Sequence, residues 1–303
     1  MGLSVTILGS NSALPTSERN PTAQVLNASG RFFLIDCGEG TQIQLRRNRV
    51  HFGKINHVFI SHLHGDHVFG LPGLISSFGL LGRTKDLHIY AISDLQAVLS
   101  PIIDYFSRDL PYKVVYHHIN AKESEVLYED SGMEVLSFPV EHRIPTVGFL
   151  FREKPKERKI NKEICDFFGV PLRDLPNLKK GEDFIDENGE RILNEKLTFP
   201  PPPSLSYAFC SDTRIKKSII EAVKNVDLLY HEATFLSDQE ELAIRTFHST
   251  ARQAARVAAD AKVKKLIIGH FSSRYKDLTP FLEEAKEVFP ETRLAEEGQV
   301  FEI

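Results

Sequence analysis

The 303-residue sequence predicts a soluble globular protein of the α/β class, and three observations support this prediction. Short apolar runs typical of buried strands alternate with segments of helical periodicity along most of the chain. Hydrophobic residues make up 42% and charged residues 26% of the chain, as in ordinary soluble globular proteins. No apolar run approaches the roughly 20 residues that a membrane-spanning helix needs, so we expect no membrane partner.

The first half of the chain begins with a predicted strand at residues 4–8. Residues 24–27 and 31–35 flank Ser29-Gly30 and predict a β-hairpin. Further strands are expected at 58–60, 87–91, 113–117, 134–140 and 147–151, the last two paired, and helices at 41–47, 70–81 and 94–106.

Residues 152–203 interrupt this alternation, because apolar periodicity weakens and Lys, Glu, Asp and Pro dominate. The stretch from Arg152 to Lys162 is strongly basic, and Lys179 and Lys180 add a basic pair. A segment this long exceeds an ordinary loop, so it is either an inserted arm or disorder. Charge runs also occur on solvated faces that have no function. We expect a single domain spanning residues 1–303, with 152–203 as a flexible arm inserted in it.

Regular alternation resumes after the arm. Strands are expected at residues 205–210, 228–231, 266–268 and 299–303, and helices at 215–223, 249–260 and 279–288. Ser249 or Thr250 is the expected N-cap of the Ala-rich helix 249–260. Thr279-Pro280 is a typical opening for the final helix.

Charge and cysteine content restrict the possible partners and compartment. The formal net charge of −4 gives no global sign of nucleic-acid binding, so a polyanionic partner would need a local basic patch. Cys37, Cys165 and Cys210 are odd in number and far apart, which excludes a disulfide framework and a CxxC zinc motif. They fit a reducing, cytoplasmic location.

The strongest functional signal is His62-Leu63-His64-Gly65-Asp66-His67, directly after an apolar run. Strand residues two apart point the same way, so His62 and His64 are expected to present two imidazoles to one point. Gly65 lets the chain turn, and Asp66 and His67 then fall at the start of the helix expected at 70–81. Two adjacent pairs of donors suit two metal ions that share a site.

Other possible ligands follow strand after strand, namely His142, Asp212, His231 and His270. A lone His at a strand end is more often structural, but a shared position beside a cluster that needs partners favours binding. Imidazole and carboxylate suit zinc, with manganese or iron as alternatives. The surplus of ligands suits two ions about 3.5–4 Å apart with one bridging carboxylate, and such a site implies hydrolysis.

The cluster resembles the HxHxDH signature of the metallo-β-lactamase superfamily. Within that superfamily the chain is similar, over almost its whole length, to the ribonuclease Z family of transfer-RNA 3′-processing endoribonucleases. Four more stretches carry this narrower resemblance: Ile35-Asp36-Cys37-Gly38-Glu39-Gly40-Thr41-Gln42, Ser211-Asp212-Thr213, His231-Glu232-Ala233-Thr234-Phe235 and His248-Ser249-Thr250.

The resemblance implies a four-layer αβ/βα sandwich, with two β-sheets face to face and helices outside. It also implies two zinc ions held by seven residues: His62, His64 and His142 on one ion, Asp66, His67 and His270 on the other, and Asp212 between them. Asp66 would also orient the attacking hydroxide or act as general base.

The resemblance further implies that His248, supported by Glu232, contacts the scissile phosphate and protonates the leaving oxygen. His231 would stand behind the ligands without binding an ion, and Thr234 and Thr250 would hold the loops. Cleavage would leave a 3′-hydroxyl on the transfer RNA and a 5′-phosphate on the trailer.

In this family the arm is an exosite for transfer RNA and reaches over the partner subunit of a homodimer. The residues expected to bind RNA are Arg19, Lys154, Lys156, Arg158, Lys159, Lys179 and Lys180. The chain departs from the family at two places. Ser17 replaces a lysine in the N-terminal loop, and the arm lacks a Gly-Pro motif.

Two alternatives remain open. One is another hydrolase of this fold that acts on a small phosphodiester, lactone or thioester. The other is a metal-stabilised RNA-binding protein without catalysis, against which Asp66, Glu232 and His248 argue, since binding alone needs no proton donor.

Overall fold

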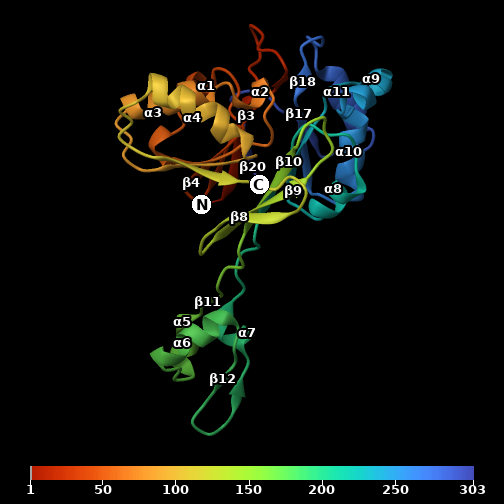
Figure 1. Cartoon of the computed structure of the whole chain (residues 1–303). Helices are drawn as coiled ribbons and strands as arrows, with labels where there is room; N and C mark the ends of the chain where they lie inside the picture. The colour runs from red at the N-terminus through yellow and green to blue at the C-terminus, as the bar shows by residue number, and fades with distance from the viewer. Residues whose placement is uncertain (1) are drawn as a thin grey trace. The chain divides into compact units, whose positions relative to one another are not determined.

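The computed structural model describes residues 2–303 and divides them into two compact units (Figure 1). We call the unit formed by residues 130–132 and 153–204 the inserted unit, and the rest of the described chain the main unit. Among the described residues, no helix is both long enough and apolar enough to cross a membrane.

The main unit contains two seven-stranded mixed sheets. The first has the order β20-β1-β3-β4-β5-β6-β7, with β1 (Leu3–Gly9), β3 (Ala23–Ala28), β4 (Arg31–Ile35), β5 (Ile55–Phe59), β6 (Leu87–Ala91), β7 (Val114–His118) and β20 (Val300–Glu302). The second has the order β19-β17-β16-β15-β10-β9-β8, with β8 (Glu125–Glu129), β9 (Met133–Pro139), β10 (Val147–Glu153), β15 (Ser206–Cys210), β16 (Leu228–Glu232), β17 (Lys265–Gly269) and β19 (Thr292–Leu294).

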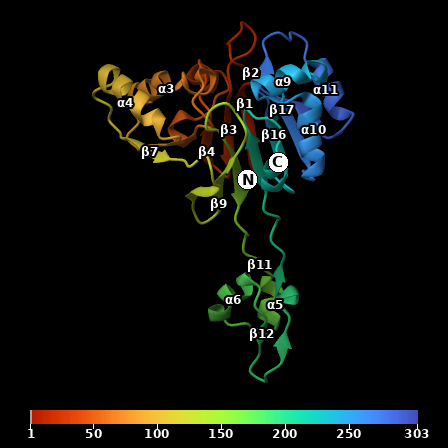
Figure 2. The same cartoon turned by 45° about the vertical axis from the view of Figure 1, so that its right-hand side comes forward.

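Helices cover the outer face of each sheet (Figures 1 and 2). On the first sheet they are α1 (Thr41–Arg47), α2 (Gly65–Val68), α3 (Leu71–Leu80) and α4 (Asp94–Phe106). On the second they are α8 (Lys217–Ala222), α9 (Glu240–Thr246), α10 (Ala251–Asp260) and α11 (Thr279–Lys286). This four-layer arrangement confirms the predicted sandwich.

The core between the sheets is rich in phenylalanine. Phe33 and Phe59 of the first sheet face Phe149 and Phe151 of the second, and all four are fully buried. Their rings meet at centroid distances of 5.4 to 5.6 Å. Burying each ring stabilises the fold by roughly 1.5–3 kcal/mol, so this contact holds the two sheets face to face.

Strand direction brings the loops of interest together. β4, β5, β6 and β7 run parallel to one another, as do β15, β16, β17 and β19. In each sheet, the carboxyl ends of these strands therefore lie at the same edge. The loops after β4 and β5 leave from this edge of the first sheet and the loops after β15 and β17 from that of the second, and these loops contain most of the predicted ligands.

Most predicted elements are present, with two corrections at the cluster itself. β5 ends at Phe59, so His62 and His64 lie in a loop and strand alternation does not align them. Asp66 and His67 lie in the separate short helix α2, not at the start of α3. Between these helices the Gly70 N–H donates to the Cys37 carbonyl oxygen at 2.9 Å and not to a helical acceptor. Gly70 also packs closely on the loop after β4, where a side chain on Gly70 would meet the Gly38 carbonyl oxygen at 2.1 Å.

Several short elements escaped prediction. β8 is only half-buried and has glutamate at both ends, which weakens its apolar signal. α9 follows an acidic turn and ends where Phe247 adopts a left-handed backbone with φ 64°. β2 (Asn11–Ser12) and β18 (Phe271–Ser272) pair over only two residues each.

The inserted unit has secondary structure of its own. It contains α5 (Lys162–Phe167), α6 (Leu175–Lys180) and α7 (Asn194–Leu197), and two short strand pairs, β11 (Lys159–Ile160) with β14 (Thr198–Phe199) and β12 (Phe184–Ile185) with β13 (Arg191–Ile192). Cys165, Leu178, Phe184, Ile192 and Leu197 form a small core. In the main unit, Arg152 pairs with Ser206 across the strands β10 and β15 between which this segment is inserted.

Candidate active site

All seven predicted ligands gather at the shared sheet edge, in groups whose ligand atoms lie within 4.8 Å of one another. One group is His62, His64, His142 and Asp212, a second is Asp66, His67 and His270, and a third is Asp212, His248 and His270. The groups overlap through Asp212 and His270. The structure therefore places the seven predicted ligands and His248 in one continuous candidate metal centre.

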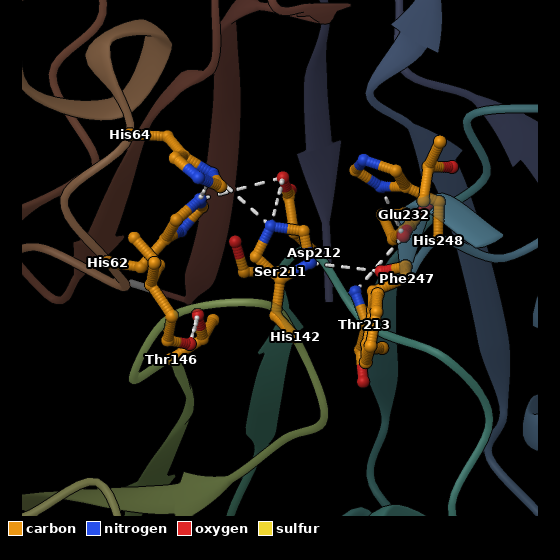
Figure 3. Close-up of polar contacts among 12 residues, drawn as sticks. His62, His64, His142, Thr146, Ser211, Asp212, Thr213, Glu232, Phe247 and His248 are labelled. Atoms are coloured by element: carbon orange, nitrogen blue, oxygen red, sulfur yellow. Dashed lines mark hydrogen bonds and ion pairs between the residues drawn. The ribbon is translucent and has the colours of Figure 1, made fainter. Parts of the chain in front are cut away.

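The first group is built around Asp212 (Figure 3). His62 Nε2 and His142 Nε2 lie 3.0 and 3.2 Å from His64 Nδ1. The same two histidine nitrogens lie 3.5 and 3.8 Å from Asp212 Oδ2. His142 donates from Nδ1 to the Phe247 carbonyl oxygen at 3.0 Å, which leaves its Nε2 free to bind an ion.

The second group uses the other oxygen of the same carboxylate. His270 Nε2 and His67 Nε2 lie 3.2 and 3.5 Å from Asp212 Oδ1. They lie 3.4 and 3.5 Å from Asp66 Oδ2, which also accepts a hydrogen bond from the Ala13 backbone N–H at 2.8 Å. Asp212 thus directs one oxygen to each group, as a bridging ligand does.

The donor set fits divalent ions. His67 Nε2 and Asp212 Oδ1 are buried and have no hydrogen-bond partner among the described residues, although buried polar atoms normally have one. Burial, followed by repulsion from His67, lowers the pKa of His62, so that ring is neutral and can bind a cation. Burial opposes ionisation of Asp66, but His67 and His270 lower its pKa well below the ordinary carboxyl range.

Asp36 supports this centre, and sequence reasoning assigned it no role. It follows β4, is fully buried and adopts a left-handed backbone with φ 55°. Its Oδ2 accepts hydrogen bonds from His67 Nδ1 at 2.7 Å and from Ser61 Oγ at 2.9 Å. A carboxylate behind a ligating histidine fixes the ring orientation and raises its basicity. Its place after an apolar strand is the same signal that selected Asp212.

Glu232 supports His248, as Asp36 supports His67. Glu232 Oε1 accepts hydrogen bonds from His248 Nδ1 at 2.9 Å and from the backbone N–H groups of Thr213 and Ser249 at 3.0 Å. Its Oε2 accepts from both the N–H and the hydroxyl of Thr234, at 3.0 and 2.9 Å. Burial by itself lowers the pKa of His248, but the Glu232 carboxylate outweighs this effect and raises the pKa to about 9.

The remaining supporting residues differ in their placement. Thr234 Oγ1 also lies 3.0 Å from His270 Nδ1, so it contacts a candidate ligand directly. Thr250 is the N-cap of α10 and forms a capping box with Gln253. His231 is fully buried, donates from Nδ1 to the Glu232 carbonyl oxygen at 2.6 Å and belongs to none of the ligand groups.

The residues expected to bind RNA fall into two classes. Some already have protein partners: Arg19 donates to Asn11 Oδ1 at 2.9 Å and to the Tyr275 carbonyl oxygen at 2.7 Å. In the inserted unit, Lys156 pairs with Glu153 at 2.7 Å and Arg158 donates to Thr198 Oγ1 at 2.6 Å, while Lys154 is half-buried. Lys159, Lys179 and Lys180 have exposed side chains.

Two family models match the chain: the Anti-Pycsar protein Apyc1 model over residues 3–149 and the Beta-lactamase superfamily domain over residues 201–271. The chain is 50% identical over 292 residues to a ribonuclease Z of Bacteroides fragilis strain YCH46, covering 96% of both chains. It is 48% identical over 294 residues to a ribonuclease Z of Porphyromonas gingivalis strain W83, covering 97% of both chains.

Solved structures share the fold. The short form of human tRNase Z is similar to the chain with a TM-score of 0.71 and 26% identity, over 98% of both chains. The metallo-β-lactamase fold protein YhfI from Bacillus subtilis has a TM-score of 0.70 at 18% identity, over 99% of both chains, and supports the fold alone.

Proposed function

The chain belongs to the ribonuclease Z family, and from this premise we propose how its residues carry out the reaction. It is an endoribonuclease that acts in transfer-RNA 3′ processing. We infer that it removes the 3′ trailer from precursor transfer RNA, leaving a 3′-hydroxyl on the transfer RNA and a 5′-phosphate on the trailer.

We propose that the centre holds two zinc ions. His62, His64 and His142 would hold one, and Asp66, His67 and His270 the other. The observation that carries this proposal is the placement of Asp212, whose two oxygens face the two groups separately. Imidazole and carboxylate donors suit zinc and also accept manganese or iron.

The residues around the centre divide the work of phosphodiester hydrolysis. Two divalent ions held there would lower the pKa of a bound water and offset the charge of a phosphodiester. Asp66, whose Oδ2 accepts a hydrogen bond from the Ala13 N–H, would orient the attacking water. His248 is protonated at neutral pH because Glu232 raises its pKa to about 9, so it can donate a proton to the leaving oxygen. Attack and departure then occur on opposite sides of phosphorus.

We further propose that the inserted unit binds transfer RNA. Lys159, Lys179 and Lys180 are exposed and can contact phosphates, which gives affinity without reading sequence. The Arg19 guanidinium holds the loop after β2 through its two hydrogen bonds to protein, so RNA phosphates would have to compete with these bonds for it. We also propose a homodimer in the cytoplasm. Three buried free cysteines support that compartment.

The decisive experiment incubates the purified chain with a 3′-extended transfer RNA and maps the cut. We expect one cut at the 3′ end of the mature transfer RNA, loss of cleavage with a chelator and recovery with zinc. His248→Ala, with the same metal content, is the matched control for contaminating nuclease. An intact precursor beside rapid turnover of a small ester would instead indicate another hydrolase of this fold.

A further inference from the structure

Two fully buried carboxylates, one in each half of the sandwich, are connected to the centre in the same way. Glu232 bonds His248 directly and reaches His270 through the Thr234 hydroxyl, with contacts of 2.9, 2.9 and 3.0 Å. Asp36 bonds one histidine directly and reaches a second histidine through a hydroxyl in the same manner.

On the Asp36 side, the direct contact is His67 Nδ1 at 2.7 Å. The indirect contact runs through Ser61, whose Oγ lies 2.9 Å from Asp36 Oδ2 and 3.0 Å from His62 Nδ1. Ser61 Oγ also lies 2.9 Å from Ser211 Oγ, in the loop after β15 of the opposite sheet. One hydroxyl therefore joins the carboxylate, a candidate ligand and the other half of the sandwich.

Hydrogen-bond accounting fixes the direction of each of these contacts. A serine hydroxyl donates once and accepts up to twice. A carboxylate only accepts, so Ser61 donates its one hydroxyl proton to Asp36. The other two partners of Ser61 Oγ, the Ser211 hydroxyl and the His62 ring, must therefore donate to it. Ser211 therefore donates to Ser61, and His62 carries its proton on Nδ1. His62 Nε2 keeps a lone pair, and it is the atom that faces His64 and Asp212.

We propose that Ser61 is a positioning residue through which Asp36 sets the tautomer of His62, while Asp36 sets that of His67 directly. Since these histidines belong to different ligand groups, one carboxylate would prepare both ion sites. The inference rests on the proposed two-ion centre. It goes beyond that centre because it assigns a function to Ser61, which connects Asp36 to His62, and to Ser211, which donates to Ser61.

The backbone does not need the Ser61 hydroxyl. The Ser61 N–H donates to Asp36 Oδ1 at 2.8 Å, and its carbonyl oxygen accepts from the Val147 N–H at 3.0 Å. Both bonds survive in Ser61→Ala, so this change removes the connection to His62 and leaves the loop held. Ser137→Ala is a matched control, because Ser137 is equally buried but its hydroxyl has no partner among the described residues.

The test begins with metal-free protein that is titrated with zinc against a chromophoric chelator, so that the two ions are measured separately. Loss of a residue behind a metal ligand typically weakens binding 10–100-fold. We expect Ser61→Ala to weaken one ion by this factor, Asp36→Asn to weaken both, and Ser137→Ala to weaken neither. Thermal unfolding of the metal-free variants separates this pattern from a general loss of stability.

A second readout needs no metal and no variant of Ser61. In metal-free protein labelled with ¹⁵N-histidine, long-range ¹H–¹⁵N correlation distinguishes the two tautomers, with His62 and His67 assigned by single replacement. We expect the neutral His62 ring to carry its proton on Nδ1. A proton on Nε2 of His62 overturns the inference. So does a Ser61→Ala variant that binds both ions as tightly as a wild type that binds two ions. A wild type that binds no ion overturns the two-ion centre itself.

Discussion

Replacement of His248 by alanine tests the proposed acid most directly. The ring is nearly buried, with 14% of its side chain exposed, and donates to Glu232 at 2.9 Å. Without it, Glu232 keeps four donors from Thr213, Ser249 and Thr234. The carboxylate therefore stays satisfied, and the stability lost is that of one hydrogen bond to a charged group, about 1.5–3 kcal/mol.

The effect on catalysis is expected to be larger and to depend on the substrate. A positioned general acid contributes about 10²–10⁴-fold to the rate. The ribose oxygen that leaves a cleaved RNA chain needs a proton, whereas p-nitrophenolate departs without one. His248→Ala should therefore slow cleavage of precursor transfer RNA by about 10²–10⁴-fold and turnover of bis(p-nitrophenyl) phosphate by less than about tenfold.

The assay compares single-turnover cleavage of a 3′-extended transfer RNA with steady-state turnover of the small diester, at equal bound metal. Metal content must be measured, because the His248 ring centroid lies 5.2 and 5.5 Å from those of the proposed ligands His142 and His270. Equal losses on the two substrates at full metal occupancy would refute the role of His248 as proton donor.

Three further predictions address the ions, the proton and the inserted unit. His64→Ala should lose an ion and abolish cleavage, whereas the exposed His118→Ala should keep both, as metal analysis and the RNA assay would show. Glu232→Gln removes the charge that holds the pKa of His248 near 9. Because RNA cleavage needs protonated His248, the cleavage rate of this variant should fall from neutral pH upward and recover near pH 6. A pH profile identical to that of the wild type would contradict this role of Glu232. Replacement of residues 153–204 by a short Gly-Ser turn should raise KM for precursor transfer RNA and spare bis(p-nitrophenyl) phosphate, and equal losses on both would assign the unit a structural role.

Sequence reasoning succeeded where a residue's type and its position after a strand carried the information. Asp212 and His270 lie far apart in sequence, yet each follows an apolar strand of one parallel set, which brings both to the same edge of the sheet. His142 follows the apolar strand β9 and joins them in the same cluster. Helices 41–47 and 94–106 have the predicted bounds because local periodicity sets them. The break between α2 and α3 was not predictable, since it depends on tertiary contact of the chain at Gly70 with the loop after β4.

Asp36 shows why the supports of the centre are harder to recognise than the ligands. Its φ of 55° is a turn conformation that glycine or asparagine adopts as readily, so the sequence alone favours a turn residue. The hydrogen bonds exclude both alternatives. Oδ1 accepts from the Ser61 N–H, and Oδ2 accepts from the Ser61 hydroxyl and His67. An asparagine amide would set its own N–H group against one of these donors, and glycine would leave all three unpaired. Position 36 therefore needs an acid because of the histidines it orients, and the turn alone would not require one.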